Sequence, residues 1–229
     1  MLCATHYFLL LSHRNFKKMA AEQTQYTPIK DGMSLMGRML KRAFDVALAL
    51  PCMVLASPVM LFCYVAIKRE DGGPAIYRQE RIGLGGKPFF IYKFRTMRLD
   101  YRETEPQLTA EGDVKNLTRI GRRLRDRHVD ELPQFWNVLK GDMSFVGPRP
   151  ERAFFIQQIE ARNPHYRDLY QIRPGITSYA TLHNGYTYNI EKMMKRLELD
   201  LYYLEHRSCV VDMKILWNTL YYIVSGKKI

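Results

Sequence analysis

Cysteine, clustered histidine and acidic side chains are all scarce in this 229-residue chain. The four cysteines are far apart and form no CxxC pair, which argues against a disulfide framework and against a thiolate zinc site. The six histidines show no ligand spacing such as HExxH, so we expect no histidine metal centre. No Gly-Lys-Ser/Thr follows the glycines at 83–86, which favours a turn between strands over a phosphate loop.

The shortage of acid leaves the chain strongly basic. Lysine and arginine number 35 against 23 aspartates and glutamates, giving a net charge of +12. Such a charge implies an anionic partner: nucleic acid, an anionic membrane or a phosphate-rich substrate. The arginine run at 119–127 has no interleaved aromatics and no recognisable reader motif after it, so no nucleic-acid partner is expected.

One long apolar run lies at residues 46–67 and carries no charged side chain. As a single helix it is long enough to cross a bilayer. Ser57 and Pro58 lie near its centre, where a proline removes a backbone hydrogen bond, and both flanks are basic. We therefore predict a re-entrant helix that breaks at Ser57-Pro58 and returns to the cytoplasmic side. A kinked crossing anchor and a buried core helix are the alternatives.

The remainder predicts an α+β fold: the re-entrant helix-break-helix, then a compact helical cytoplasmic domain with a small β-hairpin and interfacial amphipathic helices. The hairpin strands are Ile76–Ile82 and 89–96, with Lys93 and Arg95 on one face, either solvated or aimed at phosphate. The expected boundaries are a variable N-terminal appendage at 1–37, the membrane helix at 38–69, the cytoplasmic domain at 70–226 and a tail at 227–229.

An acidic pair, Asp130 and Glu131, directly follows the arginine run. The apolar spacing predicts a helix over 130–140 that Gly141 terminates, so both carboxylates would lie at a helix N-terminus. One interpretation is purely structural: Asp130 would be the N-cap of this helix. Adjacent helical residues point about 100° apart, so in a functional site one could attack while the other holds a metal ion. Downstream, Pro148 and Pro150 hold Arg149 on stiff backbone, suited to binding phosphate.

Several stretches carry a resemblance: "KRAFDVALAL", "YRQERIGLGGKPFFIYKFRTM", "VDELPQFWNVLKGDMSFVGPRPE", "IRPGIT" and "LDLYYLEHRS". Over roughly residues 38–226 the chain resembles the bacterial sugar transferases, the monotopic polyprenyl-phosphate phosphoglycosyl transferases, in their minimal catalytic form. The resemblance implies an enzyme on the cytoplasmic face of the bacterial inner membrane. It would transfer a sugar-1-phosphate from a UDP-sugar to polyprenyl (undecaprenyl) phosphate and release UMP, an early step of exopolysaccharide, lipopolysaccharide or glycoconjugate biosynthesis.

The same resemblance implies roles for individual residues. Asp130 would be the nucleophile that carries the phosphosugar, and Glu131, beside Asp130, would support Mg²⁺. Lys93, Arg125 and Arg149 would bind the substrate phosphates. Downstream glycosyltransferases are the implied protein partners.

The chain departs from the family pattern after "RPGIT", where it reads "SYATLHNGY". Relatives commonly carry arginine where this chain has Tyr186, so we expect His183, Asn184 and Tyr186 to form a donor-specificity loop. Two other functions remain open from the sequence. A basic membrane adaptor would need charge but no acidic centre, and a lipid-diphosphate phosphatase would use a base or a histidine nucleophile, for which His128 is the candidate.

Overall fold

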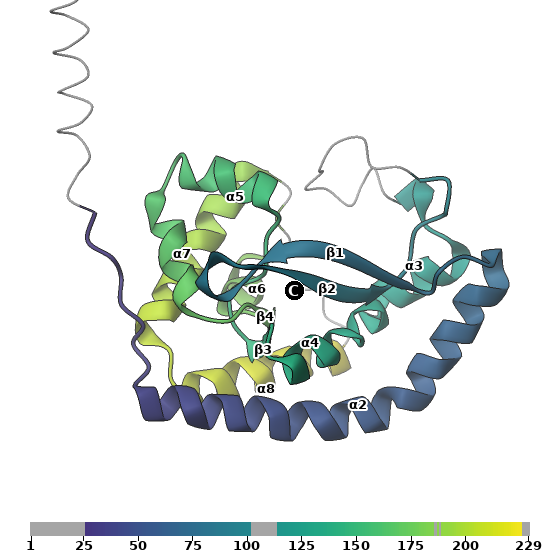
Figure 1. The fold of residues 1–229 in the computed structure, drawn as a ribbon, viewed down its shortest axis with the longest axis horizontal. Coiled ribbons are helices and arrows are strands. Elements are labelled where there is room, and N and C mark those ends of the chain that lie inside the picture. Colours follow the sequence, from purple (N-terminus) through teal and green to yellow (C-terminus); the bar gives the residue numbers. More distant parts are fainter. Residues whose placement is uncertain (1–25, 102–113, 186, 188, 226–229) are drawn as a thin grey trace, which may run out of the picture.

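The computed structural model describes residues 26–225 except 102–113, 186 and 188. It confirms a mixed fold in which a long helix, α2, runs along one edge of a mainly helical domain (Figure 1). The elements in chain order are α2 (Leu35–Asp71), β1 (Ile76–Ile82), η1 (Leu84–Gly86), β2 (Pro88–Phe94), η2 (Val114–Asn116), α3 (Arg119–Asp126), η3 (Val129–Glu131), α4 (Gln134–Lys140), β3 (Ser144–Val146), α5 (Ala153–Glu160), η4 (Pro164–Gln171), β4 (Gly175–Thr177), α6 (Tyr179–Asn184), α7 (Ile190–His206) and α8 (Cys209–Ser225).

Helix α2 is a single helix of 37 residues that bends along its course (Figure 1). Pro58 lacks the N–H that would bond to Val54 O four residues earlier, and the Ser57 hydroxyl donates to that carbonyl instead, at 2.7 Å. This side-chain hydrogen bond replaces the missing backbone bond, so the helix continues through the predicted break. By length and composition α2 could cross a membrane. The re-entrant path remains a prediction.

Both ends of α2 are fixed to the same domain. Near the start, the Lys41 ammonium lies 2.6 Å from the buried Asp212 carboxylate, and at the end Asp71 binds Arg95. Between them, the buried Asp45 faces the domain and accepts from the Ser144 hydroxyl and the amide N of Phe145.

The sequence predicts one of the two small sheets but not the other. The antiparallel hairpin pairs β1 with β2 around Gly85 and Gly86, both at positive φ, and confirms the predicted strands to within two residues. The parallel pair β3–β4 was not predicted. It requires glycine, because a Cβ on Gly147 would lie 2.3 Å from Arg173 O and one on Gly175 2.2 Å from Gly147 N.

Residues 26–33 pack on the domain, although the sequence placed them in an appendage. Asp31 forms a paired ion bridge with Arg207, at 2.6 and 2.8 Å, and the Gly32 amide donates to Leu204 O at 3.0 Å. Met33 is buried. The folded unit therefore includes residues 26–33, and residues 1–25 lie outside the described part.

Candidate active site

The acidic pair lies in η3, a single 3-10 turn between α3 and α4. The predicted helix over 130–140 begins later than expected, at Gln134, and ends as predicted at Gly141 with φ 94°. Pro133 has no N–H to bond to Val129 O, and that carbonyl accepts from Leu132 N at 3.3 Å instead. The carboxylates are consequently set ahead of α4 on a tight turn, where they face β2 and α3.

Glu131 is held by a lysine from the hairpin. The Lys93 ammonium lies 2.6 Å from Glu131 Oε1. Burial alone would raise the pKa of Glu131, but Lys93 and Arg149 together lower it to about 2. Glu131 is therefore a carboxylate at every physiological pH.

Asp130 has a different environment one residue away. It is buried, and this burial raises its pKa above the ordinary aspartate value, with the Glu131 charge adding to the rise. Lys93 and Arg125 act in the opposite direction. The pair thus combines one permanently charged carboxylate with one whose ionisation depends on the surrounding cations, so the two groups are suited to different tasks.

A buried amide positions the hairpin against the acidic turn. Asn137 of α4 accepts from Tyr92 N at 3.1 Å and donates to Phe90 O at 2.7 Å, so it bonds the backbone of β2 on either side of Ile91. This places Lys93 opposite Glu131. The role of Asn137 was missed in the sequence, although its place in "LPQFWN" on the inner face of a short helix was a signal.

Arg149 lies three residues after the end of β3, between the buried Pro148 and Pro150. Gly175 N donates to Pro148 O at 2.9 Å, which fixes this segment to β4. The half-buried guanidinium is close enough to lower the pKa of Glu131. The structure thus brings Lys93, Arg125 and Arg149 into the electrostatic field of the acidic pair. Arg95, predicted on the same face as Lys93, is buried in its pair with Asp71.

Behind Arg149 lies a buried charged network that sequence reasoning missed. Glu151 Oε1 lies 2.6 Å from Arg196 Nη1, and its other oxygen lies 3.7 Å from Arg81. Burial raises the pKa of nearby Asp200 to about 8. Within the described part of the chain, Asp200 Oδ1 has no hydrogen-bond partner. Glu151, Arg196 and Asp200 line one small cavity together with Arg149. The available signal was the i, i+4 pair Arg196 and Asp200 on the apolar face of α7.

The predicted donor-specificity residues lie on α6 and beyond it. The exposed His183 stacks on Tyr179 with ring centroids 4.1 Å apart, and Asn184 donates to Lys192 O at 3.0 Å, joining α6 to α7. Tyr186 lies outside the described residues. These bonds anchor the start of the loop, and its role in donor choice stays a prediction.

Comparison with known proteins identifies the family. The model of the bacterial sugar transferase family matches residues 36–226, so the chain belongs to that family. It is 43% identical over 183 residues to a UDP-glucose:undecaprenyl-phosphate glucose-1-phosphate transferase of Caulobacter vibrioides, covering 79% of this chain and 68% of the relative. It is 39% identical over 187 residues to a UDP-N-acetylgalactosamine-undecaprenyl-phosphate N-acetylgalactosaminephosphotransferase of Aeromonas hydrophila, covering 82% and 44%.

A UDP-glucose:undecaprenyl-phosphate glucose-1-phosphate transferase of Escherichia coli K12 is 39% identical over 191 residues, with 82% of this chain and 41% of the relative covered. The chain therefore spans less than half the length of two of these three relatives. The three names include two different donor sugars, so family membership alone does not specify the sugar.

Proposed function

We propose that this protein transfers a sugar-1-phosphate from a UDP-sugar to polyprenyl phosphate at a membrane surface. The observation that carries the proposal is the unequal acidic pair, in which a buried Asp130 stands beside a Glu131 that Lys93 keeps charged. The relatives named above act on UDP-sugars and undecaprenyl phosphate, which supports these two substrates.

In the first step an Asp130 oxygen attacks the sugar-linked phosphorus of the UDP-sugar. The bond from that phosphorus to the bridging oxygen breaks, UMP leaves with the electron pair, and the phosphosugar remains on the aspartate. In the second step an oxygen of polyprenyl phosphate attacks the same phosphorus and frees the Asp130 carboxylate. Lys93, Arg125 and Arg149 offset the charge of the phosphates, which would otherwise repel the nucleophile.

The donor set fits a magnesium ion brought in with the substrate. Mg²⁺ is typically held by one or two carboxylates plus substrate phosphates. Lys93 occupies Oε1 of Glu131, which leaves Oε2 and the neighbouring Asp130 as available protein ligands. Across the described ranges there is no cluster of three or more His, Cys, Asp or Glu, so phosphate oxygens would complete the coordination. Bound there, Mg²⁺ would neutralise phosphate charge.

The membrane part of the proposal rests on α2. Because both of its ends bind the same domain, a monotopic, re-entrant placement on the cytoplasmic face keeps Asp130 near the lipid headgroups. Exposed apolar side chains on α8, among them Trp217 and Leu220, would rest in the interface. The product would then serve a membrane glycosyltransferase that extends the sugar.

Exchange of labelled UMP into UDP-sugar, without any lipid acceptor, tests this function. Only a covalent phosphosugar route supports such exchange, because the first step must reverse before the acceptor binds. A panel of UDP-sugars in the same assay identifies the donor. Absence of exchange with every sugar, in protein that still turns over with polyprenyl phosphate, would contradict the two-step route.

A further inference from the structure

The C-terminal end of α2 and helix α3 pack together as one unit. The Glu70 carboxylate accepts from Arg119 N at 2.8 Å and Ile120 N at 3.3 Å, so the end of α2 caps the start of α3. Gly121 approaches Thr96 so closely that a Cβ would lie 2.0 Å from its carbonyl oxygen. A small separate core joins the two helices and the hairpin: Cys63, Ile67, Ala75, Phe94 and Leu124.

The outer surface of this unit is basic, and we call it the basic rim. Its exposed cations are Lys68, Arg69, Arg119, Arg122, Arg123 and Arg127. Of the nearby acids, Asp71 is paired with Arg95, whereas Glu70 caps α3 and keeps its charge within this surface. Asp126 is the exposed acid on α3 itself. Among the described residues, the six cations of the rim therefore outnumber its two acids, Glu70 and Asp126.

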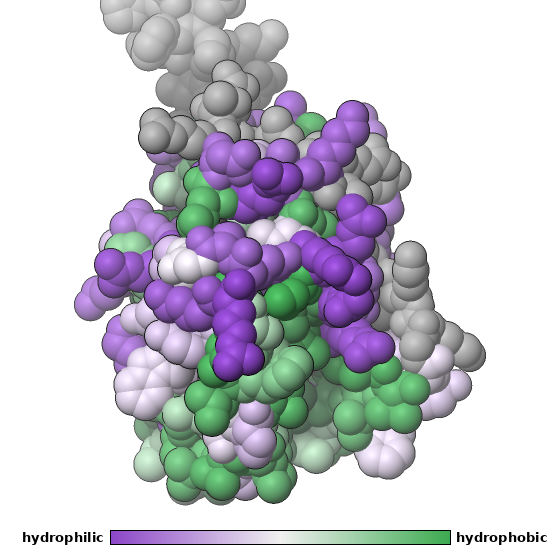
Figure 2. Space-filling view, turned by 90° about the vertical axis from the view of Figure 1, so that its right-hand side faces the viewer, coloured by the Kyte–Doolittle hydropathy of each residue, from purple (hydrophilic) through white to green (hydrophobic). Residues whose placement is uncertain are grey.

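An apolar surface borders the rim along the same helix. Leu61 and Phe62, in the turns of α2 before Lys68, are 64% and 73% exposed. Figure 2 faces the side on which α2 ends, and there hydrophobic side chains occupy the lower part with hydrophilic side chains directly above. Apolar side chains followed by cations match the order of acyl chains and headgroups in a bilayer.

We infer that the basic rim is a docking site for anionic phospholipid headgroups. The inference rests on the proposed membrane placement of α2 and adds a specific lipid chemistry to it. Cations near an anionic membrane surface each strengthen attachment by about fivefold. Helix α3 also carries Arg125, whose charge acts on Asp130. Headgroups bound at the rim would thus fix the height and tilt of the helix that leads into the acidic pair.

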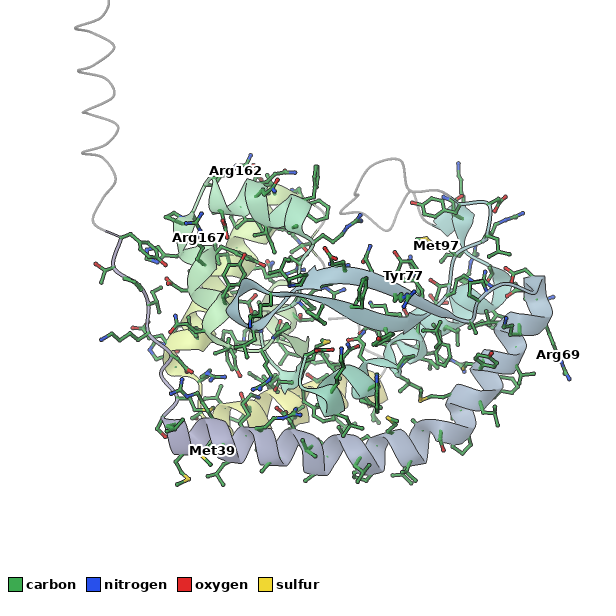
Figure 3. All side chains as sticks on the ribbon, in the orientation of Figure 1. Met39, Arg69, Tyr77, Met97, Arg162 and Arg167 are labelled. Carbon is green, nitrogen blue, oxygen red and sulfur yellow. The ribbon has the colours of Figure 1, made fainter. Side chains whose placement is uncertain are left out.

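The lipid selectivity of the protein tests whether the basic rim binds anionic headgroups. The full chain is reconstituted in phosphatidylcholine nanodiscs with trace spin-labelled phosphatidylglycerol or spin-labelled phosphatidylcholine, and the motionally restricted fraction of each is compared. We expect severalfold preference for phosphatidylglycerol, reduced by high salt. Arg119→Gln with Arg123→Gln should bring the preference close to one. The control, Arg162→Gln with Arg167→Gln, removes equal charge at the opposite end of the molecule from Arg69 (Figure 3) and should keep it.

Two results would overturn the inference: no preference in the wild-type chain, or an equal loss in the control variant. UMP exchange in detergent, measured on the same preparations, keeps this outcome separate from the proposed function. Retained exchange in the Arg119/Arg123 variant would show an intact fold. A wild-type chain that prefers anionic lipid but lacks exchange would contradict the proposed function, while the inferred lipid site at the basic rim would still hold.

Discussion

Replacing Lys93 by methionine removes the cation that faces Glu131 and keeps a long apolar stem. The two side chains are 22% and 21% exposed, so their 2.6 Å contact is largely shielded from water. The pKa of Glu131 lies at about 2 against an ordinary 4.5. At 1.36 kcal/mol per unit this difference corresponds to about 3 kcal/mol. Arg149 supplies part of it and residual water screens part, so we expect Lys93→Met to lower the free energy of unfolding by about 2 kcal/mol at neutral pH.

Lys195→Met provides the matched control. Its ammonium lies 2.8 Å from Glu198, but these side chains are 61% and 62% exposed. Such a surface pair contributes less than about 0.5 kcal/mol. Chemical denaturation of both variants in one detergent, with UMP exchange measured alongside, gives the comparison. Equal losses of stability in the two variants would refute the shielded ion pair.

The pH dependence of the Lys93 effect has a definite sign. The folded-state pKa of Glu131 is depressed, so its stabilising contribution is complete above its unfolded value of 4.5 and is lost as pH falls towards about 2. Lys93→Met lacks most of this contribution. The stability difference between wild type and variant should therefore shrink across that acid window. For catalysis, loss of Lys93 also raises the pKa of Asp130, so the acid limb of the exchange rate should move to higher pH.

Two further substitutions test the missed network and the N-terminal segment. Because the pKa of Asp200 is raised to about 8, wild-type stability should fall as pH rises from about 4 to that value, and Asp200→Asn should remove this slope. The Tm of Asp200→Asn should rise relative to that of wild type between about pH 5 and 8. A difference in Tm that stays constant over this range would contradict the raised pKa of Asp200. Gly32→Ala would place a Cβ 1.8 Å from Glu205 O, so it should cost about 2 kcal/mol or more. An unchanged Tm would mean that residues 26–33 do not pack on α7 in solution.

Local patterns in the sequence predicted those elements that local forces determine. Alternating side chains and paired glycines specified the hairpin, and Gly141 specified the end of α4. The start of α4 was misplaced because the competing 3-10 bonds around Pro133 leave the apolar spacing unchanged. Strands β3 and β4 have three residues each and pair across a distance in the chain, so no periodic signal was available.

In the candidate site, too, local sequence predicted some residues, whereas contacts between distant segments determined the rest. Asp130, Glu131 and Arg149 were conspicuous because neighbouring prolines and arginines set them apart in the sequence. The partners that give them different ionisation behaviour come from other elements, as with Lys93 on β2. Burial also decided a case that charge spacing could not: Arg95 was expected to be either solvated or aimed at phosphate, yet it is buried in its pair with Asp71.

Detection of a covalent phosphosugar on Asp130 would distinguish the proposed two-step transfer from a direct one. The full chain is incubated with its UDP-sugar and Mg²⁺ without polyprenyl phosphate, quenched, and its intact mass and peptides are measured. We expect a mass increase of one sugar phosphate, located on Asp130, that disappears in Asp130→Asn and on addition of polyprenyl phosphate. An adduct on His128 or Glu131, or Asp130→Asn protein that retains wild-type turnover without any adduct, would contradict it.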